Sequence, residues 1–210
     1  MIEMLVTRPE PDARDTAARL EALEIVPVVA PLFIRRNLET SLPGPEGFGA
    51  LALTSANALR ALEDRGLLDR YSALKVFAVG EHTAQEARDR GFAQVVSAAG
   101  SFTELVECLM RERPEGAVFY PCARDVSGDL ARSLAPFDIA VLSAPVYEFV
   151  PIGGLPHGII EGMAAGRIAA ALFYSRRAAE TFARLAAPLD QPARARLGAL
   201  DSGEAEIAAL

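Results

Sequence analysis

The chain has 210 residues with a formal net charge of −7 at pH 7, and 51% of its residues are hydrophobic. This composition supports a buried core and excludes a disordered chain, and the acidic balance argues against an extended nucleic-acid surface, which is normally basic. No stretch approaches the roughly 20 apolar residues that a membrane helix needs, and the first residues, MIEMLVTRPE, carry acids and an arginine where a signal peptide is apolar, so we expect a cytoplasmic protein.

Short apolar runs alternate with helical patterns along the chain. The first strand-like runs are MLVTR, IVPVVAPLF, ALALTS and VFAVG, and the helical stretches among them are PDARDTAARLEAL, ANALRALEDRG and EHTAQEARDRG. Such alternation predicts βαβ units and a parallel sheet. Further along, SFTE at 101–104 is typical of a capping box, so we expect a helix that begins after Ser101 and ends before Pro114.

The chain also resembles itself. Residues 5–33, shifted by 114, align without a gap on residues 119–147 with six identical positions. In the same order, ALALTSANAL at 50–59 matches AALFYSRRAA at 170–179, and FAVGEHTAQEA at 77–87 matches ALDSGEAEIAA at 199–209. Length alone allows one large domain or two small ones, but this duplication predicts two similar α/β units.

Two strand-like runs with an internal proline, VVAPLF at 28–33 and LSAPVYEF at 142–149, occupy equivalent places in the repeat. Proline has no backbone N–H to donate, so it fits an edge or an exit rather than a central strand. We therefore expect one discontinuous domain from residues 1–34 and 149–210 and a second from 38–144. Linker strands are expected near 31–37 and 145–150, where both connections form one hinge.

The ordered segments VTRPE, APLF, LTSANAL, FAVGEHTA, VFYPCARD, APVYE and LFYSRRAAETF resemble the uroporphyrinogen-III synthase (HemD) family over nearly the whole chain. The resemblance implies two HemD-like, flavodoxin-like parallel-sheet domains joined by a two-stranded linker, with the active site in the cleft between them. It also implies a cofactor-free and metal-free lyase, monomeric, that cyclises hydroxymethylbilane to uroporphyrinogen III with inversion of the terminal (D) pyrrole ring and loss of water. Hand-over of the substrate from hydroxymethylbilane synthase is part of the same expectation, and no nucleic acid or membrane partner is implied.

The resemblance gives Tyr147 the role of proton donor to the leaving hydroxyl. An unperturbed tyrosine has a pKa near 10, so it is protonated at neutral pH and able to donate. The equivalent position in the first copy is Phe33, which can only pack. The alternative for Tyr147 is a side chain packed on the linker with its hydroxyl in water.

The other candidates lie at strand-to-helix turns, where the carboxyl ends of parallel strands and free helix amides favour binding of acetate and propionate side chains. These substrate-binding candidates are Thr7, Arg8, Ser55, Asn57, Gly80, Thr83, Arg124, Ser175, Arg176 and Ser202. For any single serine or threonine among them, N-capping alone is the alternative explanation. For Arg35 and Arg36, just beyond APLF, the alternatives are a place facing the cleft and a solvated basic pair, and we favour the solvated pair.

The sequence departs from the family pattern at three places. Ala123 stands where a glycine is common, and the third repeat sets Ala205 opposite Thr83. The family usually continues with a strand and a helix beyond EAEIAAL, so we expect one sheet to lack an edge strand.

Two other classes of function compete with this interpretation. A two-lobed α/β protein that binds small anions without catalysis has the same architecture. A hydrolase or nucleotide-sugar transferase would need a G-x-S-x-G, G-x-x-x-x-G-K or G-x-G-x-x-G motif, and the chain has none. Cys108 and Cys122 have no partners at metal-ligand spacing, so neither a disulfide nor a zinc site is expected. Of the two histidines, His82 and His157, His82 lies in a candidate cleft turn, but a surface histidine in a first helical turn favours an inert role over a Ser–His–acid site.

Overall fold

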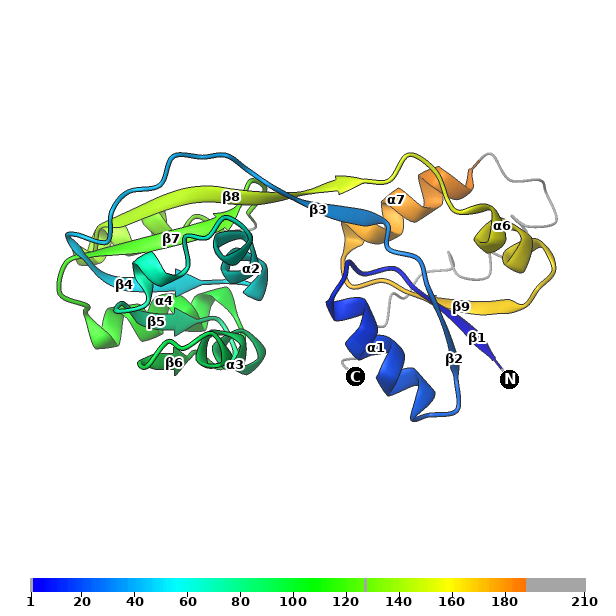
Figure 1. The fold of residues 1–210 in the computed structure, drawn as a ribbon, viewed down its shortest axis with the longest axis horizontal. Coiled ribbons are helices and arrows are strands. Elements are labelled where there is room, and N and C mark those ends of the chain that lie inside the picture. The colour runs from blue at the N-terminus through cyan, green and yellow to red at the C-terminus, as the bar shows by residue number, and fades with distance from the viewer. Residues whose placement is uncertain (1, 127, 188–210) are drawn as a thin grey trace. The chain divides into compact units, whose positions relative to one another are not determined.

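The computed structural model describes residues 2–126 and 128–187, in which strands and helices alternate as predicted. The chain divides into two compact units: unit 1 comprises residues 1–35 and 149–210, and unit 2 comprises residues 36–148. Each unit has a mainly parallel sheet with helices packed against it (Figure 1). The predicted α/β fold with parallel sheets is therefore confirmed.

Unit 1 is built on a sheet of three parallel strands in the order β2-β1-β9. Leu5 of β1 packs on one face with residues of α6 and α7, whereas its neighbour Val6 packs on the opposite face with Leu20 of α1. Successive side chains of a strand point to opposite faces, so two adjacent residues of β1 serve two helical layers. The elements are β1 (Glu3–Val6), α1 (Asp12–Glu21), β2 (Val26–Val29), α6 (His157–Ala164), β9 (Ile168–Leu172) and α7 (Arg176–Ala186).

Unit 2 contains most of a six-stranded sheet in the order β3-β8-β7-β4-β5-β6. Strands β3 (Phe33–Asn37) and β8 (Val141–Pro151) both continue across the boundary between the units. The other strands are β4 (Phe48–Leu53), β5 (Lys75–Ala78), β6 (Val95–Ser97) and β7 (Ala117–Ala123), and the helices are α2 (Ala56–Asp64), α3 (Glu81–Asp89), α4 (Phe102–Glu112) and α5 (Leu130–Leu134), with short 3-10 helices at Asp69–Tyr71 and Ala135–Phe137.

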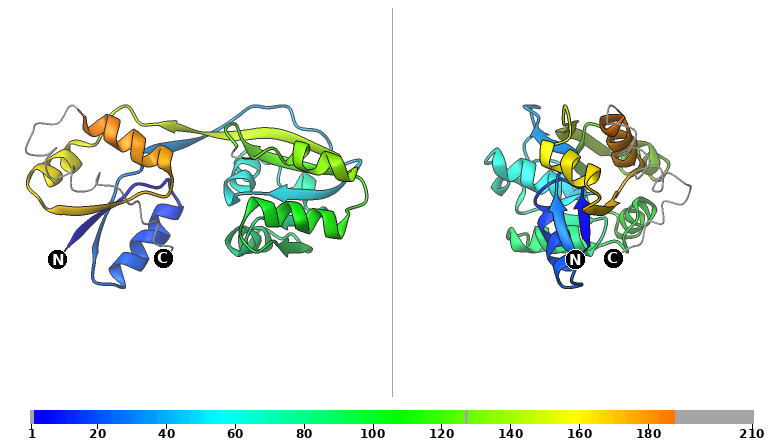
Figure 2. Two further views of the ribbon diagram at one scale, coloured as in Figure 1. Left: turned by 180° about the vertical axis from the view of Figure 1, so that it is seen from behind. Right: turned by 90° about the vertical axis from the view of Figure 1, so that its right-hand side faces the viewer.

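The core of unit 2 has the same two-faced character. Ala50, Phe77 and Val118 belong to an apolar cluster that includes buried residues of α4 and α5, while α2 and α3 contact each other. From behind, α4 lies in front of the sheet (green, left view of Figure 2). The capping box predicted for α4 is confirmed: Ser101 Oγ accepts a hydrogen bond from the Glu104 N–H at 3.2 Å, and the Glu104 carboxylate accepts one from the Ser101 N–H at 2.9 Å.

The strand order of unit 2 depends on where the count begins. Along the chain from β4 to β8, the five parallel strands lie in the order 3-2-1-4-5. Counted from β7, which the internal repeat aligns with β1, the order β8-β7-β4-β5-β6 is 2-1-3-4-5, the order of a flavodoxin-like sheet that the chain enters at β4. Local patterns show which runs are strands, but the crossover through α4, which takes the chain from β6 to the far side of β4, depends on long-range packing.

This strand order gives each unit a topological switch point. In unit 2 the switch point lies between β4 and β7. In unit 1 the first strand, β1, likewise has β2 on one side and β9 on the other. The two sheets agree with the internal repeat, because β2-β1-β9 and β8-β7-β4 are equivalent segments in the same spatial order. Ligands of open α/β sheets bind at the carboxyl ends of the strands at such points. The third repeated segment, 199–209, lies outside the described residues.

The two prolines of the repeated strands lie in different settings. Pro31 precedes β3, whereas Pro145 lies within β8, opposite Cys122 of β7. On the β3 side the Pro145 carbonyl accepts a hydrogen bond from the Thr40 hydroxyl at 2.6 Å, and the next strand-like contact there is the Leu38 N–H to the Val146 carbonyl at 2.9 Å. Because β3 ends at Asn37, the contact on this side at Pro145 comes from the Thr40 side chain rather than from a strand.

Candidate functional site

Most of the predicted site residues of unit 2 lie at one edge of its sheet. Ser55, Gly80 and Arg124 follow β4, β5 and β7 directly or within two residues, and Tyr147 lies on β8 opposite Ala123. Because these strands are parallel, their carboxyl ends meet at a single edge. Gly80 caps α3 in an extended conformation, and Thr83 is buried in the first turn of that helix.

A pair of hydroxyl groups joins β4 to β7 at the switch point. The hydroxyls of Thr54 and Tyr120 lie 3.0 Å apart. Burial raises the pKa of Tyr120 to about 12, and the hydrogen bond with Thr54 opposes that rise. The phenol is therefore neutral at pH 7, and the pair acts as an uncharged link between the two strands at the base of the candidate site.

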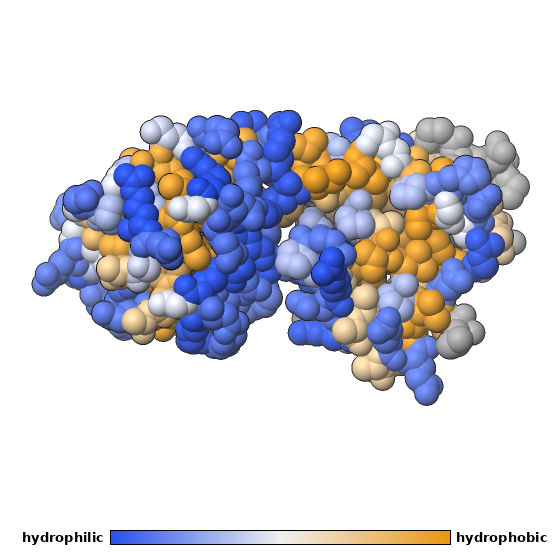
Figure 3. Space-filling view, in the orientation of Figure 1, coloured by the Kyte–Doolittle hydropathy of each residue, from blue (hydrophilic) through white to orange (hydrophobic). Residues whose placement is uncertain are grey.

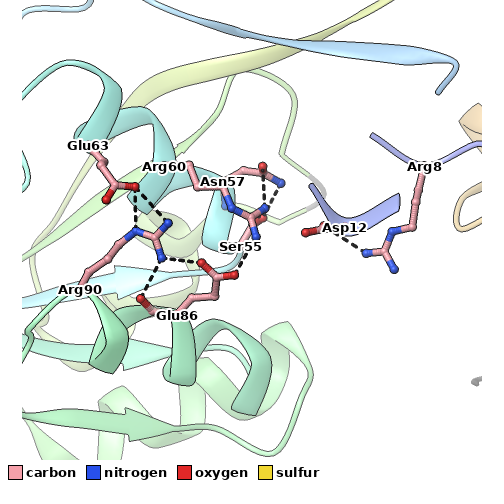
Figure 4. A network of polar contacts seen from close by, with 8 residues as sticks. All are labelled: Arg8, Asp12, Ser55, Asn57, Arg60, Glu63, Glu86 and Arg90. Atoms are coloured by element: carbon pink, nitrogen blue, oxygen red, sulfur yellow. Dashed lines mark hydrogen bonds and ion pairs between the residues drawn. The ribbon is translucent and has the colours of Figure 1, made fainter. Parts of the chain in front are cut away.

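The first turn of α2 holds Ser55 and Asn57 in a network with a buried arginine (Figure 4). The Ser55 hydroxyl accepts hydrogen bonds from the backbone N–H and the side-chain Nδ2 of Asn57, both at 3.2 Å. Arg60, which is 7% exposed, donates from Nη1 to Asn57 Oδ1 at 3.3 Å. The two predicted residues are thus held by a third that the sequence did not single out.

Arg60 is in turn paired with Glu86 of α3 (Figure 4). Its Nη2 donates to Glu86 Oε1 at 2.8 Å, and Arg90 contacts both Glu86 and Glu63. Burial alone would raise the pKa of Glu86, but hydrogen bonds and charges from Arg60 and Arg90 outweigh it and hold that pKa below its ordinary value. Glu86 therefore carries the negative charge that a buried guanidinium needs.

A second charged cluster lies beside Tyr147. The carboxylate of Glu148, which is 8% exposed, accepts hydrogen bonds from the guanidinium groups of Arg36 and Arg124, with the Arg36 Nε at 2.7 Å. The Arg124 N–H donates to the Tyr147 carbonyl at 2.8 Å. Both arginines stay more than half exposed, so each guanidinium keeps N–H groups free of the protein interior. Arg36 is thus solvent-exposed, as interpreted from the sequence, and is also held by a buried carboxylate.

Tyr147 itself lies inside unit 2. Its side chain is 4% exposed, and its strand neighbour Val146 is fully buried. Tyr147 and Phe33 are equivalent in the repeat. Phe33 lies under the guanidinium of Arg177, whose Cζ is 5.0 Å from the ring centre. The role of Tyr147 as a proton donor stays a prediction.

The predicted residues of unit 1 gather at the carboxyl ends of β1 and β9. The Thr7 hydroxyl donates to the Leu172 carbonyl at 2.5 Å, which uses its proton within the unit. Arg8 donates to Asp12 Oδ2 at 3.1 Å and lies over the ring of Tyr174, with Cζ 4.4 Å from the ring centre. The structure thus makes Thr7 a link between strands and gives Arg8 a fixed orientation.

The second group in unit 1 caps α7. The Ser175 hydroxyl accepts a hydrogen bond from the Ala178 N–H at 3.2 Å. Arg176 is largely exposed and pairs with Glu180 one turn along the helix, at 2.7 Å. Ser202 lies outside the described residues, and the predicted cleft between the two units stays a prediction.

The structure adds an apolar feature of unit 1 that the sequence did not indicate. Hydrophobic residues reach the surface over unit 1 in the face shown in Figure 3, where unit 2 is mostly hydrophilic. A pocket of about 330 Å³ lies against α1 and is lined by Thr16, Arg19, Leu20, Ala22, Leu23 and Tyr174. Few charged groups line it, so it does not suit a polycarboxylate.

The remaining reactive side chains carry no chemistry in this structure. His82 is exposed, and His157 is exposed and 3.4 Å from Glu161. Both cysteines are free and buried, and burial raises the pKa of Cys122 to about 11, so this thiol is neutral at pH 7. Within residues 2–126 and 128–187, no group of acids, histidines and cysteines is arranged to hold a metal ion, and no helix is long and apolar enough to cross a membrane.

Sequence reasoning missed Arg60, Glu86 and Glu148. A signal for Arg60 was available: in ANALRALED it follows Asn57 by three residues, which places the two side chains on one helix face, amid apolar neighbours. No local signal identified Glu148, because its two partners lie on β3 and after β7.

Comparisons with known proteins agree with this architecture. Residues 14–200 match the family model of uroporphyrinogen-III synthase HemD. A uroporphyrinogen-III synthetase from Helicobacter pylori is similar in structure, with a TM-score of 0.60 and 20% identity over 88% of this chain and 78% of that one. A mutant uroporphyrinogen III synthase from the extremely thermophilic bacterium Thermus thermophilus gives a TM-score of 0.52 and 18% identity over 94% of this chain and 81% of that one. The two structures support the fold, and the family match over most of the chain shows that it belongs to the uroporphyrinogen-III synthase HemD family of tetrapyrrole-synthesis enzymes.

Proposed function

We propose that this chain is the cyclising lyase that its family membership indicates. It converts the linear tetrapyrrole hydroxymethylbilane to uroporphyrinogen III, inverts the terminal pyrrole ring and releases water. The observation that carries the proposal is that Ser55, Arg124 and Tyr147 meet at one carboxyl edge of the unit 2 sheet in a chain of this family. A cytoplasmic location, a monomeric state and hand-over from hydroxymethylbilane synthase stay predictions.

The acidic protein must bind an acidic substrate, which carries acetate and propionate side chains. With a sequence pI near 5.0, long-range attraction does not favour it, so the binding charge has to be local. The exposed guanidinium groups of Arg36 and Arg124, both fixed by Glu148, supply that charge. Free amides at the start of α2 add a partial positive charge nearby.

The chemical step needs little from the protein beyond position and one proton. As the C–O bond of the hydroxymethyl group breaks, Tyr147 donates its proton to the departing hydroxyl, which leaves as a water molecule. The electron pair of the pyrrole stabilises the cation that remains, and ring closure at the substituted carbon of the terminal pyrrole begins the inversion. The proton lost when the ring regains aromaticity returns to the phenolate, so the enzyme ends unchanged. Holding the chain in the folded geometry favours this closure over the simple one.

The test is to supply hydroxymethylbilane made enzymatically and to analyse the uroporphyrin isomers after oxidation. We expect isomer III in excess of the isomer I that forms spontaneously. Only isomer I at all protein concentrations would contradict the proposal. The same experiment separates the enzyme from an anion-binding protein, because binding alone slows the spontaneous closure and leaves the product as isomer I.

A further inference from the structure

The network at the start of α2 has a fixed direction of hydrogen bonding. Arg60 is buried on α2, and its guanidinium has five N–H donors and no acceptor. It faces Asn57 at 3.3 Å and Glu86 at 2.8 Å (Figure 4). Asn57 must therefore turn its oxygen toward Arg60, because the opposite orientation would set two donors against each other.

This orientation determines what Asn57 presents to Ser55. With Oδ1 held by Arg60, the amide nitrogen faces the Ser55 hydroxyl at 3.2 Å and donates to it. The backbone N–H of Asn57 donates to the same oxygen at 3.2 Å. A serine hydroxyl has two lone pairs and one proton. Both lone pairs of Ser55 are thus occupied, and only its proton is left to form a further bond.

The Ser55 proton has no acceptor among the described residues, and the side chain is partly exposed at the carboxyl end of β4. A ligand group that donates cannot bind there, since no acceptor site is left on the oxygen. A carboxylate, which only accepts, is the complement of this hydroxyl and of the positive end of α2. We infer that Arg60 is a positioning residue that acts through Asn57 to fix Ser55 as a one-way donor to a carboxylate of the substrate. Naming the substrate as hydroxymethylbilane rests on the proposed function.

The equivalent serine of unit 1 lacks this device. Ser175 accepts a hydrogen bond from the Ala178 N–H, and the residue two positions on is Arg177, whose Nη2 donates to the Phe149 carbonyl at 3.2 Å. The residue that corresponds to Arg60 is Glu180. Among the described hydrogen bonds one lone pair of Ser175 is unused, so Ser175→Ala is a matched control for loss of a helix cap without loss of a directed donor.

Asn57→Asp tests the direction of the network with almost no change in shape. A carboxylate at position 57 accepts from Arg60 with one oxygen and from the Ser55 hydroxyl with the other, so the Ser55 proton turns inward. We expect the KM for hydroxymethylbilane to rise roughly tenfold, the scale of one hydrogen bond to a charged group, with a much smaller change in kcat. Ser55→Ala should give a similar rise in KM.

The double variant decides between direction and charge. If Asn57→Asp acts through the Ser55 proton, it has no further effect on KM in the Ser55→Ala background. If the new carboxylate merely repels the substrate, the two rises multiply, and the inference is wrong. Arg60→Lys, which still offers only donors, should keep KM nearer to the wild-type value than Arg60→Met does. Equal rises in the two Arg60 variants, both folded, would also contradict it.

The same comparison of wild type, Asn57→Asp, Ser55→Ala and the double variant is made with the Kd of uroporphyrin, measured by its fluorescence. This measurement needs no turnover. Wild-type protein that makes only isomer I contradicts the proposed function. If wild-type protein makes isomer III but the effects of Asn57→Asp and Ser55→Ala multiply in the double variant, only the inference about Arg60 is wrong.

Discussion

The switch points of the two units have the same backbone plan but different side chains. A threonine just after a strand spans to the neighbouring strand in each: Thr54 contacts the Tyr120 hydroxyl in unit 2, and Thr7 donates to the Leu172 carbonyl in unit 1. A serine caps the following helix in each, Ser55 on α2 and Ser175 on α7. The duplicated fold thus supplies two similar edges.

Among the described residues, the two edges carry different polar groups. Tyr147 stands where unit 1 has Phe33, and a buried Arg60 stands where unit 1 has the exposed Glu180. Unit 1 instead has Arg8 fixed by Asp12 and Tyr174. Duplication explains the shared caps and links, whereas the phenol and the buried cation need a functional explanation.

The Tyr147 and Phe33 pair gives the largest expected effect. Tyr147→Phe makes the two copies alike at this position and removes the proposed proton donor, so kcat should fall about 100-fold, at the low end for loss of general acid catalysis. The measurement is the rate of uroporphyrinogen III formation, and the circular dichroism spectrum checks the fold. Phe33→Tyr in the same chain is the control and should not restore the rate. Turnover at the wild-type rate in Tyr147→Phe would remove the acid role.

The Thr54–Tyr120 link of unit 2 and the Thr7–Leu172 link of unit 1 should contribute differently to the free energy of unfolding at alkaline pH. The pKa of Tyr120 is about 12 in the folded chain and about 10 when unfolded, so the folded state holds the proton more tightly. Its stabilisation is present below pH 10 and is lost as the pH rises from 10 to 12, by up to about 2–3 kcal/mol. Tyr120→Phe should flatten the fall in unfolding free energy, measured in urea across this range. Thr7→Val, whose link does not titrate, should lower stability without changing the slope. A wild-type slope in Tyr120→Phe would contradict the assignment.

Glu148 holds Arg36 and Arg124 at the unit 2 edge, and Asp12 holds Arg8 at the unit 1 edge. Of these two acids, Glu148 is the one proposed to orient substrate-binding groups. Glu148→Gln removes the charge that holds Arg36 and Arg124, so we expect KM for hydroxymethylbilane to rise roughly tenfold, with kcat less affected. Asp12→Asn, which releases Arg8 in unit 1, is the matched variant. A larger rise in KM for Asp12→Asn would mean that unit 1 contributes more of the binding charge than unit 2.

The sequence was sufficient where local chemistry determines the outcome. The caps at Ser55, Ser101 and Ser175 and the alternation of strands and helices depend on residues within one turn, and the structure agrees with each. The order in which the chain enters the unit 2 sheet was not predictable from such patterns. Hydrophobic periodicity determines which face of a strand is buried but does not select its neighbour.

The same limit applies to the candidate site. Turn positions identified Ser55, Asn57 and Arg124, whereas Arg60 and Glu148 were missed because their partners are distant in sequence. Arg60 pairs with Glu86 on another helix, and Glu148 lies 112 positions from Arg36. A buried charge is stable only beside its partner, and only the folded topology shows which partner that is.

The two serine caps give the smallest expected effect and the finest distinction between the edges. Ser55→Ala and Ser175→Ala each remove a helix cap, at a cost of about 1 kcal/mol to the local free energy of opening. Ser55→Ala also leaves the Asn57 Nδ2 without its acceptor, so its cost should be the larger of the two. Hydrogen exchange of the capped amides of Asn57 and Ala178 measures both costs separately, since local opening of one helix need not unfold the other. Equal acceleration at the two amides would show that Asn57 finds another partner. In that case the hydrogen-bond direction at Ser55 is not rigidly determined by Arg60.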